Sequence, residues 1–286
     1  MKNTYDSIII VSFPRSGTHF LIDSLLHNLS IKQQQYYDIS HIKLVLNEEK
    51  YIPFTLHQKL SNWLSLKSNV QTLQQLNKMK KPLVVKADHL LPEYYEKHKE
   101  FMSKQKIIYI YRNPEDVMKS YYHYVRIAYN VYYDSMGQLL RSKNNFGGEF
   151  SDLTVMECWS CHVKNWSLKE NVFTLSFEEM RADYQKSMEQ ISHFLNIPLK
   201  KAHILPPKRL PYNKALRTLV KVISRFIDLH YGVTGIVGKS KEIKIELTQE
   251  DSDYIALNSK SILEKLSQLC PGGRVIVLTP KMLPIS

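Results

Sequence analysis

Short apolar segments alternate with longer amphipathic ones along most of this chain. Four short segments are apolar at consecutive positions and rich in β-branched residues, as strands buried on both faces are: residues 7–13, 83–87, 106–112 and 172–177. The longer segments carry apolar residues at helical spacing: 19–29, 114–129, 153–169, 178–195 and 248–269. Because the two kinds alternate, the sequence predicts a three-layer α/β/α fold with a central parallel sheet.

Two helix starts carry local signals. Pro114 stands at the first position of its predicted helix, where a missing N–H costs nothing. Thr248 is followed three residues later by Asp251, a pair that resembles a capping box. These signals fix where two of the predicted helices begin.

The chain contains no internal repeat and no Gly/Ser-rich linker. We therefore predict that residues 1–286 form one domain. Residues 31–81 are polar and Gln-rich, and we interpret them as an insertion on the side of the ligand site where a second substrate, the acceptor, would bind. A short edge strand is predicted at residues 274–278.

The first apolar segment leads at once into a tight polar loop, Phe-Pro-Arg-Ser-Gly-Thr at residues 13–18, and then into a helix. Backbone N–H groups and a helix N-terminus meet at such a turn, which suits a phosphate group. Arg15, Ser16 and Thr18 add side-chain donors. The loop is not GxxxxGK[ST], so an ordinary kinase or ATPase is disfavoured, and we predict a shorter, P-loop-like phosphate site.

Polar residues also follow two further predicted strands. The three clusters are residues 15–19, 86–89 and 112–120. Because parallel strands place their carboxyl ends at one edge of a sheet, the clusters are expected to meet there and to bind one polyanionic ligand.

The net charge of +12 fits nucleic acid, a membrane surface or an anionic small molecule. A nucleic-acid-binding module would gather its basic residues on one helix or sheet face with aromatic residues between them. Here the best basic positions fall at strand ends, which favours a pocket for a small polyanion over nucleic acid.

The three cysteines do not indicate a metal or a disulfide framework. Cys158 and Cys161 form a CxxC pair within a predicted helix, and no second ligand pair completes a metal site. We interpret both as core residues, and Trp159, Trp166 and His162 on the same helix as structural. The apolar run at the N-terminus is too short for a signal peptide, and no stretch approaches membrane-spanning length, so we predict a cytoplasmic protein.

Three motifs carry a resemblance to a known family. The loop at residues 13–18 resembles the 5′-phosphosulfate loop of the sulfotransferases that use 3′-phosphoadenosine-5′-phosphosulfate (PAPS). Residues 109–123, YIYRNPEDVMKSYYH, are similar to the family's 3′-phosphate motif, and residues 172–180 resemble its strand ending in Tyr-Glu-Asp-Met. The order and spacing agree over roughly residues 7–200 with cytosolic and bacterial members.

For the phosphate loop, the resemblance implies the following roles. Arg15 contacts the bridging oxygen of the leaving group, where cytosolic members usually have Lys. Ser16, Gly17 and Thr18 hold the 5′-phosphate through N–H and hydroxyl groups, and His19 contributes its backbone N–H.

The resemblance places the rest of the donor site on later segments. Arg112 and Ser120 bind the 3′-phosphate, and Phe177 replaces a Tyr that packs on adenine. Residues 232–286 diverge from the family pattern, and Lys239 or Lys241 would supply the charge missing there.

The general base has two candidates, because the family's Lys-Thr-His-Leu-Pro reads Lys-Ala-Asp-His-Leu-Leu-Pro here. Counting from Lys86, the family's His position is Asp88; counting back from Leu90, it is His89. We prefer His89, since an imidazole titrates near neutral pH, while a buried Asp remains the alternative. Lys86 would help to neutralise the transferring group.

The resemblance thus implies in-line transfer of a sulfuryl group from PAPS, as co-substrate, to a hydroxyl of an unidentified acceptor: a carbohydrate, a lipid or a small alcohol. No metal is required. The alternatives are a P-loop-type kinase and a sulfotransferase-like protein that binds nucleotide without turnover. The sequence does not predict the oligomeric state.

Overall fold

The computed structural model describes residues 7–31, 37–38, 83–88, 90–97, 99–129, 131–143, 150–200, 205 and 246–269. Several predictions lie outside these residues. They are the insertion predicted at residues 31–81 apart from residues 31 and 37–38, the edge strand at 274–278, and the residues His89, Lys239 and Lys241.

Within the described residues, five parallel strands form one sheet in the order β2-β3-β1-β4-β5. The strands are β1 (Ser7–Ser12), β2 (Tyr37–Asp38), β3 (Leu83–Lys86), β4 (Lys106–Tyr111) and β5 (Val172–Ser176). The four predicted strands are confirmed, each one residue shorter at its carboxyl end. The two-residue edge strand β2 was not predicted.

Helices connect the strands. They are α1 (Thr18–Asn28), α4 (Pro92–Lys97), α5 (Lys99–Met102), α6 (Pro114–Tyr129), α7 (Met136–Arg141), α8 (Val155–Ser167), α9 (Phe177–Ala182), α10 (Tyr184–Leu195) and α12 (Gln249–Leu269). The predicted start at Pro114 is confirmed. At the start of α12, the N–H of Asp251 donates to Thr248 Oγ1 and the N–H of Thr248 to the Asp251 carboxylate, so the capping pair is confirmed.

One helix prediction was wrong. Residues 178–195 form two helices, α9 and α10, rather than one. Asp183 separates them with φ −134° and ψ 77°, and its carboxylate caps α10 by accepting from the N–H of Lys186. Asp competes for backbone donors in this way because its short side chain reaches the first turn of a helix.

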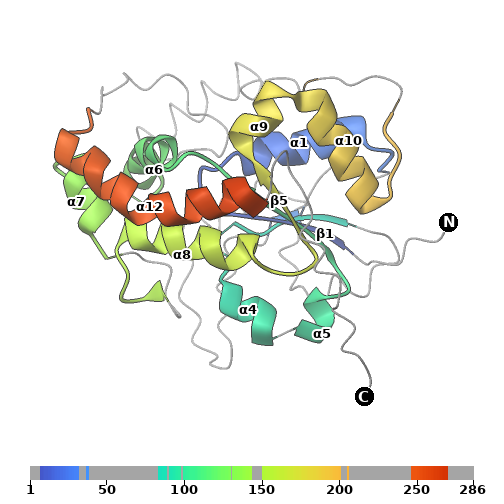
Figure 1. Ribbon diagram of the computed structural model, residues 1–286, viewed down its shortest axis with the longest axis horizontal. Coiled ribbons are helices and arrows are strands. Elements are labelled where there is room, and N and C mark those ends of the chain that lie inside the picture. The colour runs from blue at the N-terminus through green and yellow to red at the C-terminus, as the bar shows by residue number, and fades with distance from the viewer. Residues whose placement is uncertain are drawn as a thin grey trace, which may run out of the picture.

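Helices cover both faces of the sheet (Figure 1), and an apolar cluster fills the space between the sheet and each helix layer. Ile8 and Ile10 face α1 and α10, while Ile9 and Val11 face the side covered by α6, α8 and α12. Neighbouring residues alternate in this way because successive side chains of a strand point to opposite faces. The result is the three-layer arrangement predicted from the sequence.

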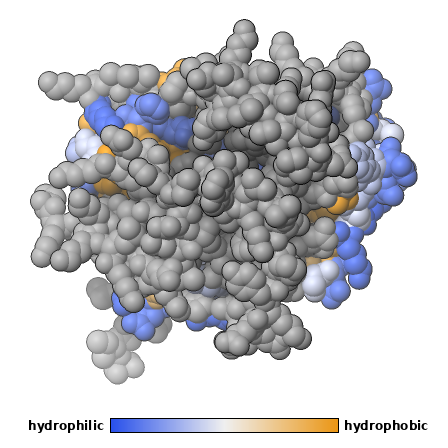
Figure 2. Space-filling model, turned by 180° about the vertical axis from the view of Figure 1, so that it is seen from behind, coloured by the Kyte–Doolittle hydropathy of each residue, from blue (hydrophilic) through white to orange (hydrophobic). Residues whose placement is uncertain are grey.

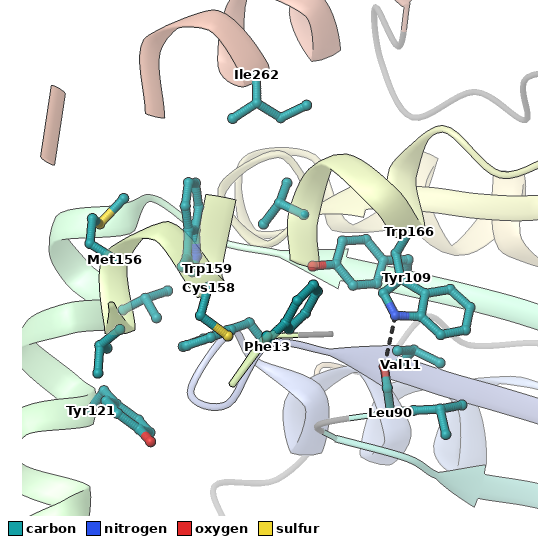
Figure 3. Packing of buried hydrophobic residues seen from close by; sticks show 14 of the residues in the cluster. Val11, Phe13, Leu90, Tyr109, Tyr121, Met156, Cys158, Trp159, Trp166 and Ile262 are labelled. Carbon is teal, nitrogen blue, oxygen red and sulfur yellow. Dashed lines mark hydrogen bonds between the residues drawn. The ribbon is translucent and has the colours of Figure 1, made fainter. Parts of the chain in front are cut away.

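Figure 3 shows the cluster beneath α8, where Trp166 Nε1 donates to the carbonyl of Leu90 at 2.8 Å. His162 lies between Leu90 and β4: its Nε2 is 3.2 Å from the same carbonyl, and its Nδ1 is 2.9 Å from the Tyr109 hydroxyl. The Leu90 carbonyl can only accept, so Nε2 donates to it, and in the neutral imidazole Nδ1 then accepts from the Tyr109 hydroxyl. Burial raises the pKa of Tyr109 well above its ordinary value. The structural roles predicted for Trp159, Trp166 and His162 are confirmed, and the last two also hold the segment that follows β3.

In the view of Figure 2, the described surface is mainly hydrophilic, with small hydrophobic patches. Among the helices that the structure describes, none has the length and apolar character needed to cross a membrane.

Candidate active site

The loop at residues 13–18 lies at the carboxyl end of the central strand β1, between β3 and β4. The chain visits β2 and β3 on one side of β1 and then crosses to β4 on the other, which is the kind of edge where α/β sheets bind ligands. The turn is tight: the N–H of Ser16 donates to the carbonyl of Phe13 at 3.3 Å. Arg15 (φ 73°) and Gly17 (φ 100°) both adopt left-handed backbone conformations.

Gly17 is required by its surroundings as well as by its φ. A Cβ at this position would lie 2.3 Å from Cδ2 of Phe177. The Phe177 ring therefore packs directly on the loop, from the first position of α9 rather than from the end of β5 where the sequence placed it. Residues 160 positions apart in the sequence thus form one wall of the site.

Ser16 carries a polar atom without an internal partner. Its side chain is fully buried, and its Oγ has no hydrogen-bond partner in the part of the chain that the structure describes. Buried hydroxyls are normally hydrogen-bonded, so this one is a candidate for contact with a ligand. Helix α1 begins two residues later with no acidic residue in its first turn, and the N–H groups at its N-terminus favour an anion at the same place.

Arg15 is joined to the 3′-phosphate motif. Its Nε donates to Ser120 Oγ at 2.9 Å, and its guanidinium lies 5.3 Å from the centre of the Tyr124 ring. Burial lowers the pKa of Arg15 from its ordinary value, while Tyr124 and Asp88 act in the opposite direction. A guanidinium held away from water interacts more strongly with an anion than an exposed one does.

Arg112 lies on the other side of Phe177, with its guanidinium 5.1 Å from the ring centre. One guanidinium nitrogen bonds to Asp116 at 3.1 Å, and the buried Nε lies 3.9 Å from Glu178. That Nε has no hydrogen-bond partner among the described residues. Arg112 is therefore oriented by two carboxylates, and its Nε–H can still donate a hydrogen bond to a ligand.

The cluster at residues 86–89 is joined to the loop by the contact of Asp88 with Ser12. One carboxylate oxygen accepts a hydrogen bond from Ser12 Oγ at 2.9 Å, and the other lies 2.9 Å from Lys86 Nζ. Ser12 Oγ is also 2.6 Å from Thr18 Oγ1. Lys86 and Asp88 are nearly buried, with side chains 6% and 12% exposed. The expected meeting of the three clusters at one edge is confirmed for these residues.

Sequence reasoning missed some of the site. Ser12 was counted only as a strand residue, although a hydroxyl at the end of an apolar run is a usable signal. No role was predicted from the sequence for Tyr124 or for Glu178, which also accepts from the N–H of Asn113 at 3.1 Å. His19 is the second residue of α1.

Chemically, this edge combines two guanidinium groups, a helix N-terminus and a buried carboxylate. The first two suit a ligand with separate anionic groups, and the carboxylate suits proton transfer. Among the described residues, no group of His, Cys, Asp and Glu side chains is arranged to hold a metal ion.

Comparison with known proteins places the chain in a family and supports this reading of the fold. Residues 5–224 match the family described as sulfotransferase domain. Human sulfotransferase 2B1 is 29% identical over 204 residues, covering 68% of this chain and 48% of the relative. Rabbit amine sulfotransferase is 26% identical over 209 residues, covering 70% and 59%. The chain thus spans only about half the length of these curated relatives.

A solved structure shows the same fold. The crystal structure of mouse sulfotransferase SULT7A1 complexed with PAP has a TM-score of 0.50 and 20% sequence identity. The match covers 92% of this chain and 87% of the mouse chain. The predicted P-loop-like α/β fold is therefore confirmed, and with the match over residues 5–224 the chain belongs to the sulfotransferase domain family.

Proposed function

We propose that this protein is a sulfotransferase that moves a sulfuryl group from PAPS to a hydroxyl of an acceptor. The observation that carries the proposal is the joining of the two predicted phosphate sites by the Arg15–Ser120 hydrogen bond, next to the buried hydroxyl of Ser16, which has no partner among the described residues. Family membership and the printed names of the relatives support the reaction class.

The described residues fit a nucleotide with phosphates at both ends of its ribose. The N–H groups at the start of α1 and the Ser16 hydroxyl would bind the 5′-phosphate. Arg112 and Ser120 would bind the 3′-phosphate, and the exposed part of the Phe177 ring would pack on adenine.

Arg15 would stabilise the charge that develops as the donor's sulfur–oxygen bond breaks. Its guanidinium is permanently charged, so it acts by charge stabilisation and does not donate a proton. Lys86, close to the same edge, would neutralise the sulfuryl oxygens.

The transfer balances with one proton moved. The acceptor oxygen bonds to sulfur, and the bond from sulfur to the 5′-phosphate oxygen breaks, leaving adenosine 3′,5′-bisphosphate (PAP) with that electron pair. The acceptor's proton passes to a base. Asp88, which accepts from Ser12 and pairs with Lys86 next to the loop, is one candidate for this base, and His89 is the other.

Activity is tested with sulfur-labelled PAPS and a panel of steroid alcohols, phenols, sugars, lipids and amines. We expect label to move to at least one hydroxyl acceptor and transfer to fall by about 10²-fold or more in Arg15→Ala. Donor binding without transfer to any acceptor would support the non-catalytic alternative. Phosphoryl transfer from ATP in a parallel assay would support the kinase alternative.

The nature of the acceptor, the cytoplasmic location and the single-domain organisation over residues 1–286 stay predictions. The names of two relatives, amine sulfotransferase and 3-beta-hydroxysteroid sulfotransferase, justify including amines and steroids in the panel.

A further inference from the structure

A row of three hydrogen-bonding groups crosses the site from the phosphate loop to the candidate base. Thr18 Oγ1 lies 2.6 Å from Ser12 Oγ, which lies 2.9 Å from the Asp88 carboxylate. Ser12 is fully buried and Thr18 is 4% exposed. The mechanism outlined above considers Asp88 as a base and notes its contact with Ser12, but it gives the Ser12 hydroxyl no part in binding the donor.

The direction of these hydrogen bonds follows from counting hydrogens. A hydroxyl has one hydrogen, and Ser12 donates it to Asp88, because an ionised carboxylate only accepts. The hydrogen in the contact between the two hydroxyls must then come from Thr18. While Asp88 is ionised, the Thr18 hydrogen therefore points to Ser12 and not into the phosphate loop.

Protonation of Asp88 permits the opposite direction. The acid hydrogen would be donated to Ser12, Ser12 would donate to Thr18, and the Thr18 hydrogen would become available to an oxyanion in the loop. Both arrangements use the same positions of the heavy atoms, so no backbone movement is needed.

We propose that Ser12 is a positioning residue that makes anion binding in the 13–18 loop and protonation of Asp88 favour each other. The inference rests on the proposed function, because it takes the anion to be the 5′-phosphate end of PAPS or PAP. By thermodynamic reciprocity, a bound donor would raise the proton affinity of Asp88 by the same factor as the proton tightens donor binding. At pH values where Asp88 is still ionised in the donor complex, the bound donor would thereby make it a stronger base toward the acceptor's proton.

The charges that face Asp88 act the other way. Lys86 Nζ lies 2.9 Å from one carboxylate oxygen, and Arg15 interacts with Asp88 electrostatically. Both favour the ionised carboxylate, and both remain in place when Ser12 is replaced. A change in proton coupling caused by a Ser12 substitution therefore reports the hydrogen-bond row and not these charges.

The test is calorimetric titration of the full chain with PAP between pH 5 and 8, in buffers of different ionisation enthalpy, which counts the protons taken up. His89 is replaced by Asn throughout, so that the adjacent imidazole does not titrate. Asp88→Asn gives the baseline for proton uptake by the phosphates of PAP itself.

Above that baseline we expect proton uptake on PAP binding, with the Kd rising by up to about tenfold per pH unit where Asp88 titrates. Ser12→Ala should lose at least half of this uptake, and Ser12→Thr should restore it. Ser12→Cys, a weak donor of similar size, should fall between them and serves if Ser12→Ala does not fold.

Equal uptake in the Ser12 variants and the parent would overturn the proposed role of Ser12 and leave the proposed function standing. If the parent fails to bind PAP at all, the proposed function fails and the coupling fails with it.

Discussion

The two predicted phosphate sites differ in how their donors are satisfied. In the loop at residues 13–18, Arg15 donates to a neutral hydroxyl and Ser16 Oγ is unpartnered among the described residues. At the other site, Arg112 contacts the carboxylates of Asp116 and Glu178. An anion bound in the loop would form hydrogen bonds that replace few existing ones, so their full binding free energy is available. At Arg112, an anion must compete with two carboxylates that already contact the guanidinium. We infer that the loop dominates affinity and that Arg112 chiefly selects for a 3′-phosphate.

The largest loss of PAP affinity is expected from a substitution in the loop itself. Gly17→Ala would combine an unfavourable φ with a contact of 2.3 Å to Phe177, and we expect PAP binding to weaken by about 4 kcal/mol. Isothermal calorimetry measures the loss. Gly137→Ala is a matched control, since its Cβ would meet Asp251 Oδ1 at 2.7 Å on a different helix. Equal effects of the two substitutions on PAP affinity would contradict the role of the loop.

Removing Arg112 tests the selective site. Arg112→Ala should weaken PAP binding by about 3 kcal/mol, because a phosphate would lose a charged partner. Binding of 5′-AMP, which lacks the 3′-phosphate, should change much less. Parallel titrations with both nucleotides separate the effects. Equal losses of affinity for PAP and 5′-AMP would mean that Arg112 does not recognise the 3′-phosphate.

Ser16→Ala should have opposite effects on binding and stability. PAP affinity should fall by about 1 kcal/mol, the contribution of one hydrogen bond. The thermal midpoint of the free protein should stay constant or rise, because a buried hydroxyl without a partner is removed. A fall in that midpoint without a change in PAP affinity would mean that Ser16 has a structural role.

The smallest effect concerns the competing carboxylates. Asp116→Asn removes one of them, and PAP binding should tighten by about 0.4 kcal/mol, as expected for a pair this exposed. Glu115→Gln is the control, because Glu115 pairs with Lys119 at 3.4 Å on the same helix. Weaker binding in Asp116→Asn would show that the carboxylate positions Arg112 rather than competing for it.

The same contrast explains what the sequence could predict. The loop and the four main strands were predictable because a run of apolar residues ending in donors leaves a local pattern. The β2 strand was missed because two residues carry no periodicity, and the break at Asp183 was missed because apolar spacing continues across it. Glu178 was missed because its hydrogen bond to Asn113 spans 65 positions, which no local pattern records. The Ser12 hydroxyl is visible at the end of an apolar run, but its partner Asp88 lies 76 positions away.

The most direct test is a calorimetric titration of the full chain with PAP, ATP and 5′-AMP under one condition. We expect PAP to bind at least about tenfold more tightly than either of the others, because only PAP carries phosphates for both sites. Equal affinity for PAP and 5′-AMP, or tighter binding of ATP, would contradict a site built from Arg15, Ser16, Arg112 and Ser120 for a nucleotide with 3′- and 5′-phosphates.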